Sequence, residues 1–387
     1  MTVNRDHETG TPTDEASTPD RNTWIGLNRR AGTPAQRRSV LDSGSMPMFD
    51  LPLDDLRGYR PEVAEPDDLD EFWISTMAET RAHDLAVTST LIDNKLALID
   101  TYDVSFAGFG GAPVRAWLHV PAGATAALPT VIQYHGYSGG RAFPHSYTQW
   151  AQAGYAHWVM DTRGQGWKEG GGPGTPDPAE ESGLMHAPGF MTAGITDPAG
   201  YYYRRVYADA VRMLEVARQS ELVDPDRIIV TGGSQGGGIT LAAAGIAAVV
   251  GIELLAAAPD VPFLCQFQRA LELTDGYPYQ EITDYLAGWR DQVFSAYRTL
   301  SYFDGVNLGR RAVVPALFSV GLMDPICPPS TVFAAFNHYG SKAADYGSMA
   351  TGSVPKDIRV YSHNQHEGGG FYQVDAQLDW FAELFGG

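Results

Sequence analysis

The chain has 387 residues, of which 44% are hydrophobic and 11% aromatic, and this is enough apolar material to bury a sizeable core. Its 46 Asp and Glu residues outnumber its 27 Lys and Arg residues, which gives a formal net charge of −19. So acidic a surface repels phosphate backbones and anionic lipid heads, and we therefore expect no nucleic-acid or membrane partner.

The N-terminal segment is rich in Thr, Pro, Asp, Glu, Arg and Gly and lacks a sustained apolar period, so we expect residues 1–45 to be a disordered tail. This segment holds no apolar stretch of the secretory type, which predicts a cytoplasmic protein. Compact sequence begins near Met46, and residues 46–387 are predicted to form a single domain.

From residue 49 onward, short apolar runs alternate with segments of helical spacing. Strands are predicted within 104–120 and at 130–134, 156–160, 227–230, 253–257, 315–320 and 357–361. Helices are predicted at 71–81, 201–219, 235–249, 330–338 and 372–384. This alternation is typical of the α/β fold class, in which a mainly parallel sheet carries helices on both faces.

Two stretches depart from this pattern, and a third resembles a membrane span in composition. The segment 166–198 is crowded with Gly and Pro, notably at Gly170–Gly174, which predicts a long irregular loop of functional or interfacial use. The aromatic-rich segment 262–304 is expected to be helical and to form a small cap. The segment 239–259 is almost wholly apolar but contains Glu253, so we expect a helix and a buried strand rather than a membrane span.

The chain has two cysteines, Cys265 and Cys327, which cannot form a disulfide framework. A reducing compartment and indifference to redox both explain this count. Neither cysteine lies in a Cys/His spacing of the zinc type, and we expect no metal and no cofactor.

A nucleophile motif stands at residues 232–236, where Gly-Gly-Ser-Gln-Gly satisfies the G-x-S-x-G pattern. The five-residue pattern alone also occurs in ordinary turns. Here a predicted strand precedes it and an Ala-rich helix follows, and this context predicts Ser234 as the nucleophile. Because position 235 begins the helix, its backbone N–H and the helix dipole point at developing negative charge.

A serine hydroxyl needs a base, and in folds with this motif the chain order is Ser, then Asp or Glu, then His. Three histidines follow Ser234, namely His338, His363 and His366. His338 falls in a predicted helix, where a packed or surface role is expected. The other two follow the last predicted strand, and His366, which precedes a Gly-rich turn, is favoured over His363 as the base.

The acid that orients this base is expected after the penultimate strand. Asp324 follows the predicted strand 315–320, so it emerges at the C-terminal edge of the sheet, where open α/β sheets place their active sites. There it would accept a hydrogen bond from the imidazole and fix its tautomer. The alternative interpretation is an Asp that caps a helix before Pro325.

An acyl-transfer site also needs two donors for the tetrahedral oxyanion. One is the backbone N–H of Gln235, and the second is expected from the loop after the strand 130–134, which reads His-Gly-Tyr-Ser-Gly-Gly. The N–H of Tyr137 is the predicted second donor. His135 is expected to pack and to hold this loop rather than to act as the base.

Four signals resemble the acetyl xylan esterase / cephalosporin C deacetylase family, which is carbohydrate esterase family 7. They are Arg163-Gly164-Gln165, the segment 232–236, Asp324 within Gly-Leu-Met-Asp-Pro, and His366-Glu367. The resemblance covers residues 46–387, where similar segments also occur at 48–53, 188–192 and 201–205.

The resemblance implies an α/β-hydrolase fold and the removal of acetyl groups from small acetylated sugars, notably xylo-oligosaccharides, and from cephalosporin C. The triad would be Ser234, Asp324 and His366, with the oxyanion donors named above. The family also builds a ring-like homohexamer through an interface loop, whose position matches 166–198. The chain departs from the family in its N-terminal tail and in the Gly-rich part of this loop.

Arg163 and Glu367 belong to family motifs but have no evident chemical step. We hypothesise that both are structural, as are Gly164 and Gln165. In this hypothesis Arg163 braces the loop of His366 and Glu367 through a charge-assisted pair.

Two rival interpretations of the chain are kept. One is a related hydrolase, such as a longer-chain carboxylesterase or a dipeptidyl-type peptidase, although the sequence has no segment that suggests an extra domain for peptide access. The other is a binding module that kept the fold without activity, against which the complete set of Ser, Asp, His and donor loop argues.

Overall fold

The computed structural model of the chain describes residues 48–168, 174–178, 189–347 and 353–386. The part from Met46 to Gly387 forms one unit. The predicted tail, residues 1–45, lies outside the described residues, and so do residues 169–173 and 179–188 of the predicted loop 166–198.

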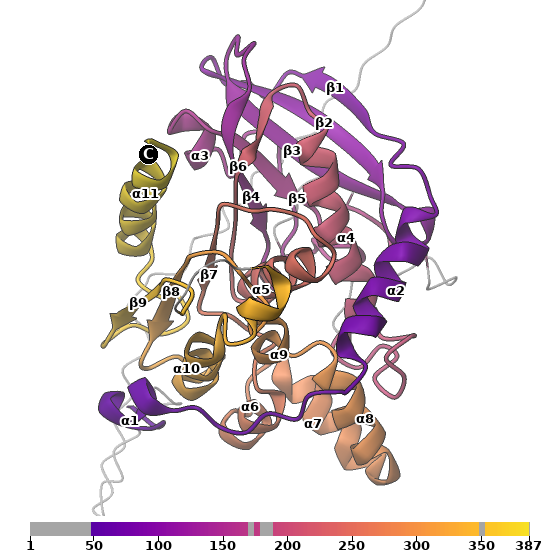
Figure 1. Ribbon diagram of the computed structural model, residues 1–387, viewed down its shortest axis with the longest axis vertical. Coiled ribbons are helices and arrows are strands. Elements are labelled where there is room, and N and C mark those ends of the chain that lie inside the picture. Colours follow the sequence, from indigo (N-terminus) through magenta and orange to yellow (C-terminus); the bar gives the residue numbers. More distant parts are fainter. Residues whose placement is uncertain (1–47, 169–173, 179–188, 348–352, 387) are drawn as a thin grey trace, which may run out of the picture. The chain divides into compact units, whose positions relative to one another are not determined.

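A mixed sheet runs through the described part of the chain, with nine strands in the order β1-β2-β3-β5-β4-β6-β7-β8-β9 (Figure 1). The pairs β1–β2, β2–β3 and β3–β5 are antiparallel, and all pairs from β5–β4 to β8–β9 are parallel. The strands are β1 (Thr88–Ile92), β2 (Ile99–Ala107), β3 (Pro113–Pro121), β4 (Leu128–Tyr134), β5 (Ala156–Met160), β6 (Val223–Gly233), β7 (Ala256–Asp260), β8 (Ala316–Gly321) and β9 (Lys356–Tyr361).

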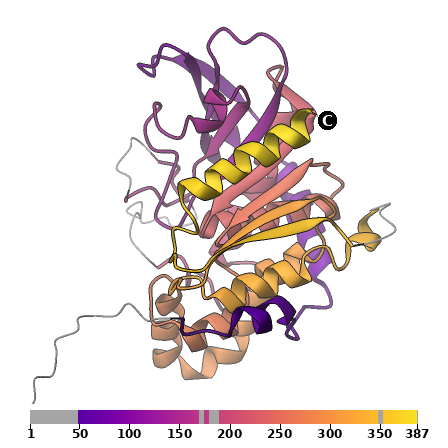
Figure 2. The same cartoon turned by 90° about the vertical axis from the view of Figure 1, so that its left-hand side faces the viewer.

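Helices cover both faces of this sheet (Figures 1 and 2). One face carries α3 and α11, where Trp150 packs against Phe381 with ring centroids 4.8 Å apart. The opposite face carries α2, α4 and α5. The helices are α1 (Leu53–Gly58), α2 (Leu69–Arg81), α3 (Gln149–Gln152), α4 (Tyr202–Arg218), α5 (Gln235–Val249), α6 (Phe267–Leu273), α7 (Tyr279–Gly288), α8 (Val293–Ser301), α9 (Gly305–Gly309), α10 (Pro329–His338) and α11 (Phe371–Gly386), with 3-10 turns η1 (Phe109–Gly111), η2 (Arg290–Gln292) and η3 (Ala343–Tyr346).

Strand β6 shows why the central strands consist of continuous apolar runs. Ile228 and Val230 pack in the core under α4 and α5, whereas Ile229 packs in the core under α3 and α11. All three side chains are fully buried. Because helices cover both faces, successive residues of the strand must all be apolar.

The strand order changes direction at β4, which lies between β5 and β6. The loop after β4 leads to α3 on one face, whereas the loop after β6 leads to α5 on the other. Ligands of open α/β sheets bind where two such loops diverge. A cavity lined by Gly136 and Tyr137 from the first loop and Ser234 from the second lies at this point.

The predicted fold class is confirmed, and most predicted elements are present. The helix at 235–249 and the strand at 156–160 have the predicted bounds. The strand predicted at 253–257 was placed too early, because it spans Ala256–Asp260. The apolar residues before it belong to the turn after α5, where Ile252 N–H donates to Ala247 O over 2.8 Å.

The apolar segment 239–259 is divided between α5 and β7, as predicted, with Gly251 in the turn at φ +73°. Among the described residues, no helix is both long and apolar enough to cross a membrane. The segment 262–304 is helical, as predicted, and contains α6, α7 and α8.

Candidate active site

The nucleophile motif forms a tight turn between β6 and α5, as its sequence context predicted. Ser234 lies in this turn at φ +58° and ψ −121°, a backbone conformation that costs a residue with a side chain on the order of 1–3 kcal/mol. A Cβ atom at Gly236 would lie 2.3 Å from the carbonyl oxygen of Tyr134, so only glycine permits this approach of helix to strand. The turn places Ser234 at the carboxyl end of β6, where it lines the cavity.

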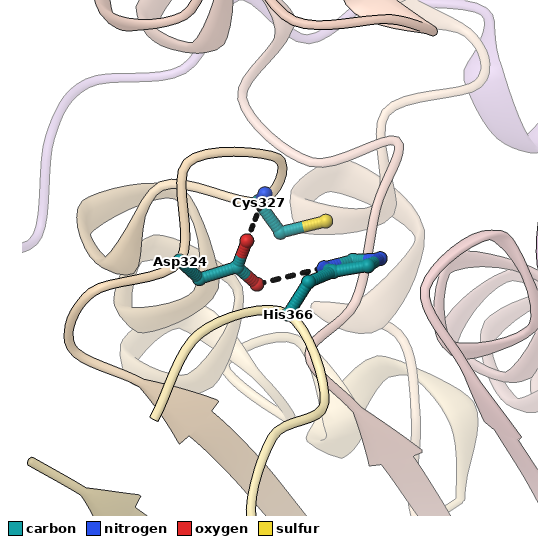
Figure 3. Close-up of side chains that lie close together, drawn as sticks. All are labelled: Asp324, Cys327 and His366. Atoms are coloured by element: carbon teal, nitrogen blue, oxygen red, sulfur yellow. Dashed lines mark hydrogen bonds and ion pairs between the residues drawn. The ribbon is translucent and has the colours of Figure 1, made fainter. Parts of the chain in front are cut away.

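Ser234, His366 and Asp324 meet at this edge from three different loops. His366 Nδ1 lies 2.8 Å from Asp324 Oδ2 (Figure 3). On the other side of the ring, His366 Nε2 lies 2.9 Å from Ser234 Oγ. The two contacts fit an imidazole that donates from Nδ1 to the carboxylate oxygen of Asp324 and accepts at Nε2 from the serine hydroxyl. The geometry is that of a base poised to take the Ser234 proton.

Asp324 is held by the turn that follows β8. Its Oδ1 accepts hydrogen bonds from the backbone N–H groups of Ile326 (2.8 Å) and Cys327 (3.0 Å). The side chain of Asp324 is fully buried, whereas that of His366 is 32% exposed. The carboxylate is therefore shielded from water while the imidazole stays open to a substrate. The alternative of a helix-capping aspartate is wrong, because α10 begins at Pro329 and its N-cap is Pro328.

The other candidate histidines lie elsewhere. His338 ends α10, is buried, and places Nε2 2.8 Å from the carbonyl oxygen of Pro61. His363 is exposed, three residues before His366 in the same turn. His135 is buried with its ring 4.7 Å from that of Tyr147, which fits the expected packing role.

Of the two predicted oxyanion donors, Tyr137 lines the same cavity as Ser234, and Gln235 directly follows the serine in the chain. Tyr137 follows β4 and Gln235 is the first residue of α5. Neither backbone N–H donates a hydrogen bond to any residue that the structure describes. Gly136, Tyr137, Ser234 and His366 all line one cavity of about 1010 Å³. The serine therefore stands beside free N–H groups at the positive end of a helix.

Comparison with known proteins identifies the family of this chain. A model of the acetyl xylan esterase (AXE1) family matches residues 46–384. The chain belongs to the acetyl xylan esterase family. An acetyl xylan esterase from Paenibacillus sp. R4 is 39% identical, and the match covers 86% of this chain and 99% of that one with a TM-score of 0.76.

Two further relatives agree. Acetyl xylan esterase 1 from Thermoanaerobacterium sp. JW/SL YS485 is 31% identical over 87% of this chain and 100% of that one, with a TM-score of 0.74. Acetyl esterase Axe7A of Xylanibacter ruminicola is 25% identical over 297 residues, which are 72% of this chain and 63% of that relative. The resemblance and the α/β-hydrolase fold are thereby confirmed, and the family is one of carboxylic ester hydrolases.

Arg163, the first residue of the segment Arg163-Gly164-Gln165, does not brace the histidine loop. Its guanidinium makes two hydrogen bonds to Asp209 of α4, at 2.6 Å from Nε and 2.7 Å from Nη2, and lies 3.4 Å from Asp177. Arg163 and both carboxylates are buried. Burial raises the pKa of Asp209, and the charge of Arg163 opposes this rise. The hypothesis of a pair with the His366 loop is therefore wrong.

Glu367, the proposed partner, is exposed and acts locally. Its carboxylate accepts from Asn364 Nδ2 (2.7 Å) and from the backbone N–H of Gln365 (3.1 Å). Glu367 thus closes the turn that carries His366. The prediction failed because Asp209 lies 46 residues after Arg163 in sequence, with no motif to mark it.

A glutamate that sequence reasoning missed connects the cap to the donor loop of this esterase. Tyr137 Oη donates to Glu281 Oε1 of α7 over 2.7 Å and accepts from the backbone N–H of Phe190 over 3.2 Å. Burial raises the pKa of Glu281, although the hydrogen bond from Tyr137 opposes this. Tyr277, Pro278 and Glu281 also line the cavity, so the cap forms one of its walls.

One set of side chains near the serine has metal-ligand chemistry. Asp324, Cys327 and His366 each place a potential ligand atom within 4.8 Å of the others (Figure 3). The hydrogen bonds of Asp324 already occupy its two oxygens and His366 Nδ1. Burial raises the pKa of the Cys327 thiol well above its ordinary value, so it stays protonated. The donor set therefore fits proton transfer better than metal binding.

Proposed function

We propose that the chain is an acetyl xylan esterase that removes O-acetyl groups from small acetylated carbohydrates, such as xylo-oligosaccharides, and from cephalosporin C. The observation that carries the proposal is the Ser234–His366–Asp324 series, with distances of 2.9 and 2.8 Å, beside two unengaged backbone N–H groups. Family membership and the names of the relatives support an acetyl ester as the substrate.

Acylation begins when Ser234 Oγ attacks the acetyl carbonyl carbon while His366 Nε2 takes the hydroxyl proton. The carbonyl electron pair moves to oxygen, where the N–H groups of Tyr137 and Gln235 stabilise the charge. The bond from this carbon to the sugar oxygen then breaks, and that oxygen leaves with the proton from His366. The acetyl group remains on Ser234.

Deacylation repeats these steps with water in place of the serine. His366 takes a proton from the water as its oxygen attacks the acetyl carbon, and the same two N–H groups hold the second oxyanion. Collapse breaks the bond to Ser234 Oγ, which receives the proton from His366, and acetate is released. The buried Asp324 keeps the imidazole oriented and stabilises its positive charge in both halves of the cycle.

The cavity has room for an acetyl ester whose alcohol part contains a ring. Its volume of about 1010 Å³ is far larger than an acetyl group and leaves room for a sugar or a fused ring system. Trp167 and Tyr277 contribute aromatic surface to its wall, beside Lys168 and Glu281. Such a lining suits a substrate that presents both C–H faces and hydroxyl groups.

The resemblance adds proposals on assembly and organisation. We propose a cytoplasmic homohexamer whose catalytic domain spans residues 46–387, preceded by a tail at 1–45. Sedimentation velocity at several protein concentrations, on the full chain and on a chain that starts at Met46, measures the assembly and tests whether the tail contributes to it.

The first experiment compares hydrolysis of p-nitrophenyl acetate, butyrate and octanoate by the wild-type protein and by Ser234→Ala and His366→Ala. We expect a strong preference for acetate and a loss of at least about 10⁴-fold in kcat for each variant. His363→Ala is the matched control, because this exposed histidine lies in the same turn, and it should retain wild-type kcat. Acetate release from acetylated xylose and cephalosporin C then tests the two proposed substrates.

Each contrary result points to a different rival. A preference for butyrate or octanoate would indicate a longer-chain carboxylesterase with the same triad. If the wild-type protein hydrolyses none of the esters and a fluorophosphonate does not label Ser234, the chain is a binding module. Loss of activity in His363→Ala but not in His366→Ala would assign the base to the other histidine.

A further inference from the structure

Two glutamine side chains lie directly behind the predicted oxyanion hole. Gln165 comes from the loop after β5 and Gln235 is the first residue of α5, and both side chains are fully buried. Gln165 Nε2 donates to Gln235 Oε1 over 2.9 Å, and Gln235 Nε2 donates back to Gln165 Oε1 over 3.2 Å. The two primary amides therefore form a reciprocal pair between two loops of the sheet edge.

All hydrogen-bonding capacity of this pair is used. Gln165 also accepts from the backbone N–H of Ser138 (2.8 Å) and donates to Tyr202 Oη (3.1 Å). Gln235 also donates to the carbonyl oxygen of His135 (3.2 Å) and accepts from Tyr203 Oη (2.9 Å). A primary amide has two donors and two acceptor sites, so each side chain makes the maximum of four hydrogen bonds.

The orientation of both amides is determined by the backbone groups they meet. Ser138 N–H requires the oxygen of Gln165, and the His135 carbonyl requires the nitrogen of Gln235. Rotating either amide by half a turn would place like groups opposite each other. In a site without solvent, each unsatisfied group would cost about 1–3 kcal/mol.

The two backbone contacts fall on either side of the predicted donor. The His135 carbonyl belongs to the peptide before Gly136, and the Ser138 N–H belongs to the peptide after Tyr137. The Gly136 carbonyl itself accepts from Gly139 N–H over 2.9 Å. The peptide between Gly136 and Tyr137, which carries the Tyr137 N–H, is therefore fixed in three ways. Hydrogen bonds hold the peptide before it, the peptide after it, and its own carbonyl oxygen.

We propose that the amide pair of Gln165 and Gln235 sets the position of the Tyr137 N–H, which makes Gln165 a positioning residue of the oxyanion hole. The inference rests on the proposed function. A donor stabilises an oxyanion only when it is aligned to within a fraction of an ångström, and loss of a whole donor costs about 10²–10³ in turnover. Gln165 is fully buried and is not among the described residues that line the cavity, so its effect acts through the loop that it holds.

The test is Gln165→Met, which keeps the length of the side chain and removes its hydrogen bonds. We expect kcat for p-nitrophenyl acetate to fall about 10- to 100-fold with little change in KM, because the oxyanion exists only after substrate is bound. Affinity for phenylboronic acid, which forms a tetrahedral adduct on the serine, should fall by a similar factor.

The matched control is Asn94→Leu, which also keeps the shape of a buried side-chain amide and removes its hydrogen bonds. Asn94 donates to Ile99 O (2.8 Å) and to Thr101 Oγ1 (2.6 Å), and it is not among the described residues that line the cavity of Ser234. We expect it to lower the melting temperature about as much as Gln165→Met does while leaving kcat and the boronate affinity unchanged.

Two further outcomes decide the question. If Gln165→Met is less stable but keeps wild-type kcat and boronate affinity, Gln165 is only structural and the inference is overturned. If Gln165→Met does not fold, Gln165→Glu takes its place. It retains an acceptor for Ser138 N–H and loses the amide donor, so an unchanged kcat there would equally overturn the inference. A wild-type protein that neither hydrolyses the ester nor binds the boronate would instead refute the proposed function.

Discussion

The two sides of the active site are built by different means. On the donor side, the loop after β4 is held by buried side chains, chiefly the amides of Gln165 and Gln235, which are fully buried. On the base side, His366 stands in a largely exposed turn after β9 that is held by short-range contacts and by backbone hydrogen bonds, such as the one from Met323 N–H to Asn364 O over 3.1 Å. There Glu367 accepts from Asn364 and Gln365, and Gly370 N–H donates to Glu367 O over 2.8 Å.

This difference determines which kinds of substitution destabilise each side. When a buried polar side chain is removed, water cannot reach its partners to replace the lost hydrogen bonds. Substitutions on the donor side should therefore lower the free energy of unfolding strongly. An exposed contact can be replaced by water, so the base side depends on backbone conformation instead. Three successive glycines, at 368, 369 and 370, have φ of +53°, +91° and +51° in this turn.

The largest effect is expected for Arg163→Ala, which tests whether a buried ion pair contributes more to stability than an exposed one. The variant leaves the carboxylate of Asp209 buried without its partner, and the free energy of unfolding should fall by about 3–5 kcal/mol. Arg81→Ala is the control, because Arg81 pairs with Glu215 at a similar distance of 2.7 Å but is 38% exposed, and it should lose less than about 1 kcal/mol. Urea denaturation measures both, and equal losses would break the contrast.

A smaller effect is expected for Gly369→Ala on the base side. Its Cβ would lie 2.3 Å from the ring of Tyr361 at a φ of +91°, and we expect a loss of about 2–3 kcal/mol in unfolding free energy together with a lower kcat. Gly154 has a φ of +97° but open space around its Cβ position. Gly154→Ala should therefore lose only the backbone part, about 1 kcal/mol, and should retain kcat. Identical behaviour of the two variants would exclude the steric contribution of Tyr361.

The smallest effect is expected for Glu367→Ala, which removes a side chain of the base turn. We expect less than about 1 kcal/mol of destabilisation and a kcat within about threefold of wild type. The hydrogen bond from Asn364 lowers the pKa of Glu367 from its ordinary 4.5. Its contribution is thus present at neutral pH and is lost as the pH falls below 4.5 through the lowered pKa. Activity and melting temperature at pH 7 and pH 4 measure this, and a tenfold loss of kcat at pH 7 would contradict it.

The positions of the candidate triad along the chain could be predicted because local signals mark them. Ser234 lies in a five-residue motif between a strand and a helix, and Asp324 and His366 follow the last two strands of the parallel sheet. In a parallel sheet all carboxyl ends lie at one edge, so strand order and loop position bring these residues together. The choice of His366 over His363 rested on the Gly-rich turn, and the structure places His366, with Nε2 2.9 Å from Ser234 Oγ, beside the serine.

The supporting contacts could not be predicted in the same way. Gln165 and Gln235 are 70 residues apart, Arg163 and Asp209 are 46 apart, and Tyr137 and Glu281 are 144 apart. Each pair depends on the direction of two side chains from different elements, which neither periodicity nor a motif encodes. The prediction for Arg163 was wrong for the same reason. A charge-assisted pair requires only a carboxylate nearby, and the sequence does not show which carboxylate lies next to Arg163.

The sequence by itself determined the family, the alternation of strands and helices, and the order of Ser, Asp and His along the chain. These follow from local backbone preferences and from which residues must be apolar on both faces of a sheet. Only the tertiary structure decided which buried polar groups pair with one another. Hydrogen bonds in a core without solvent are selected by distance and angle, and those emerge only when the elements have packed.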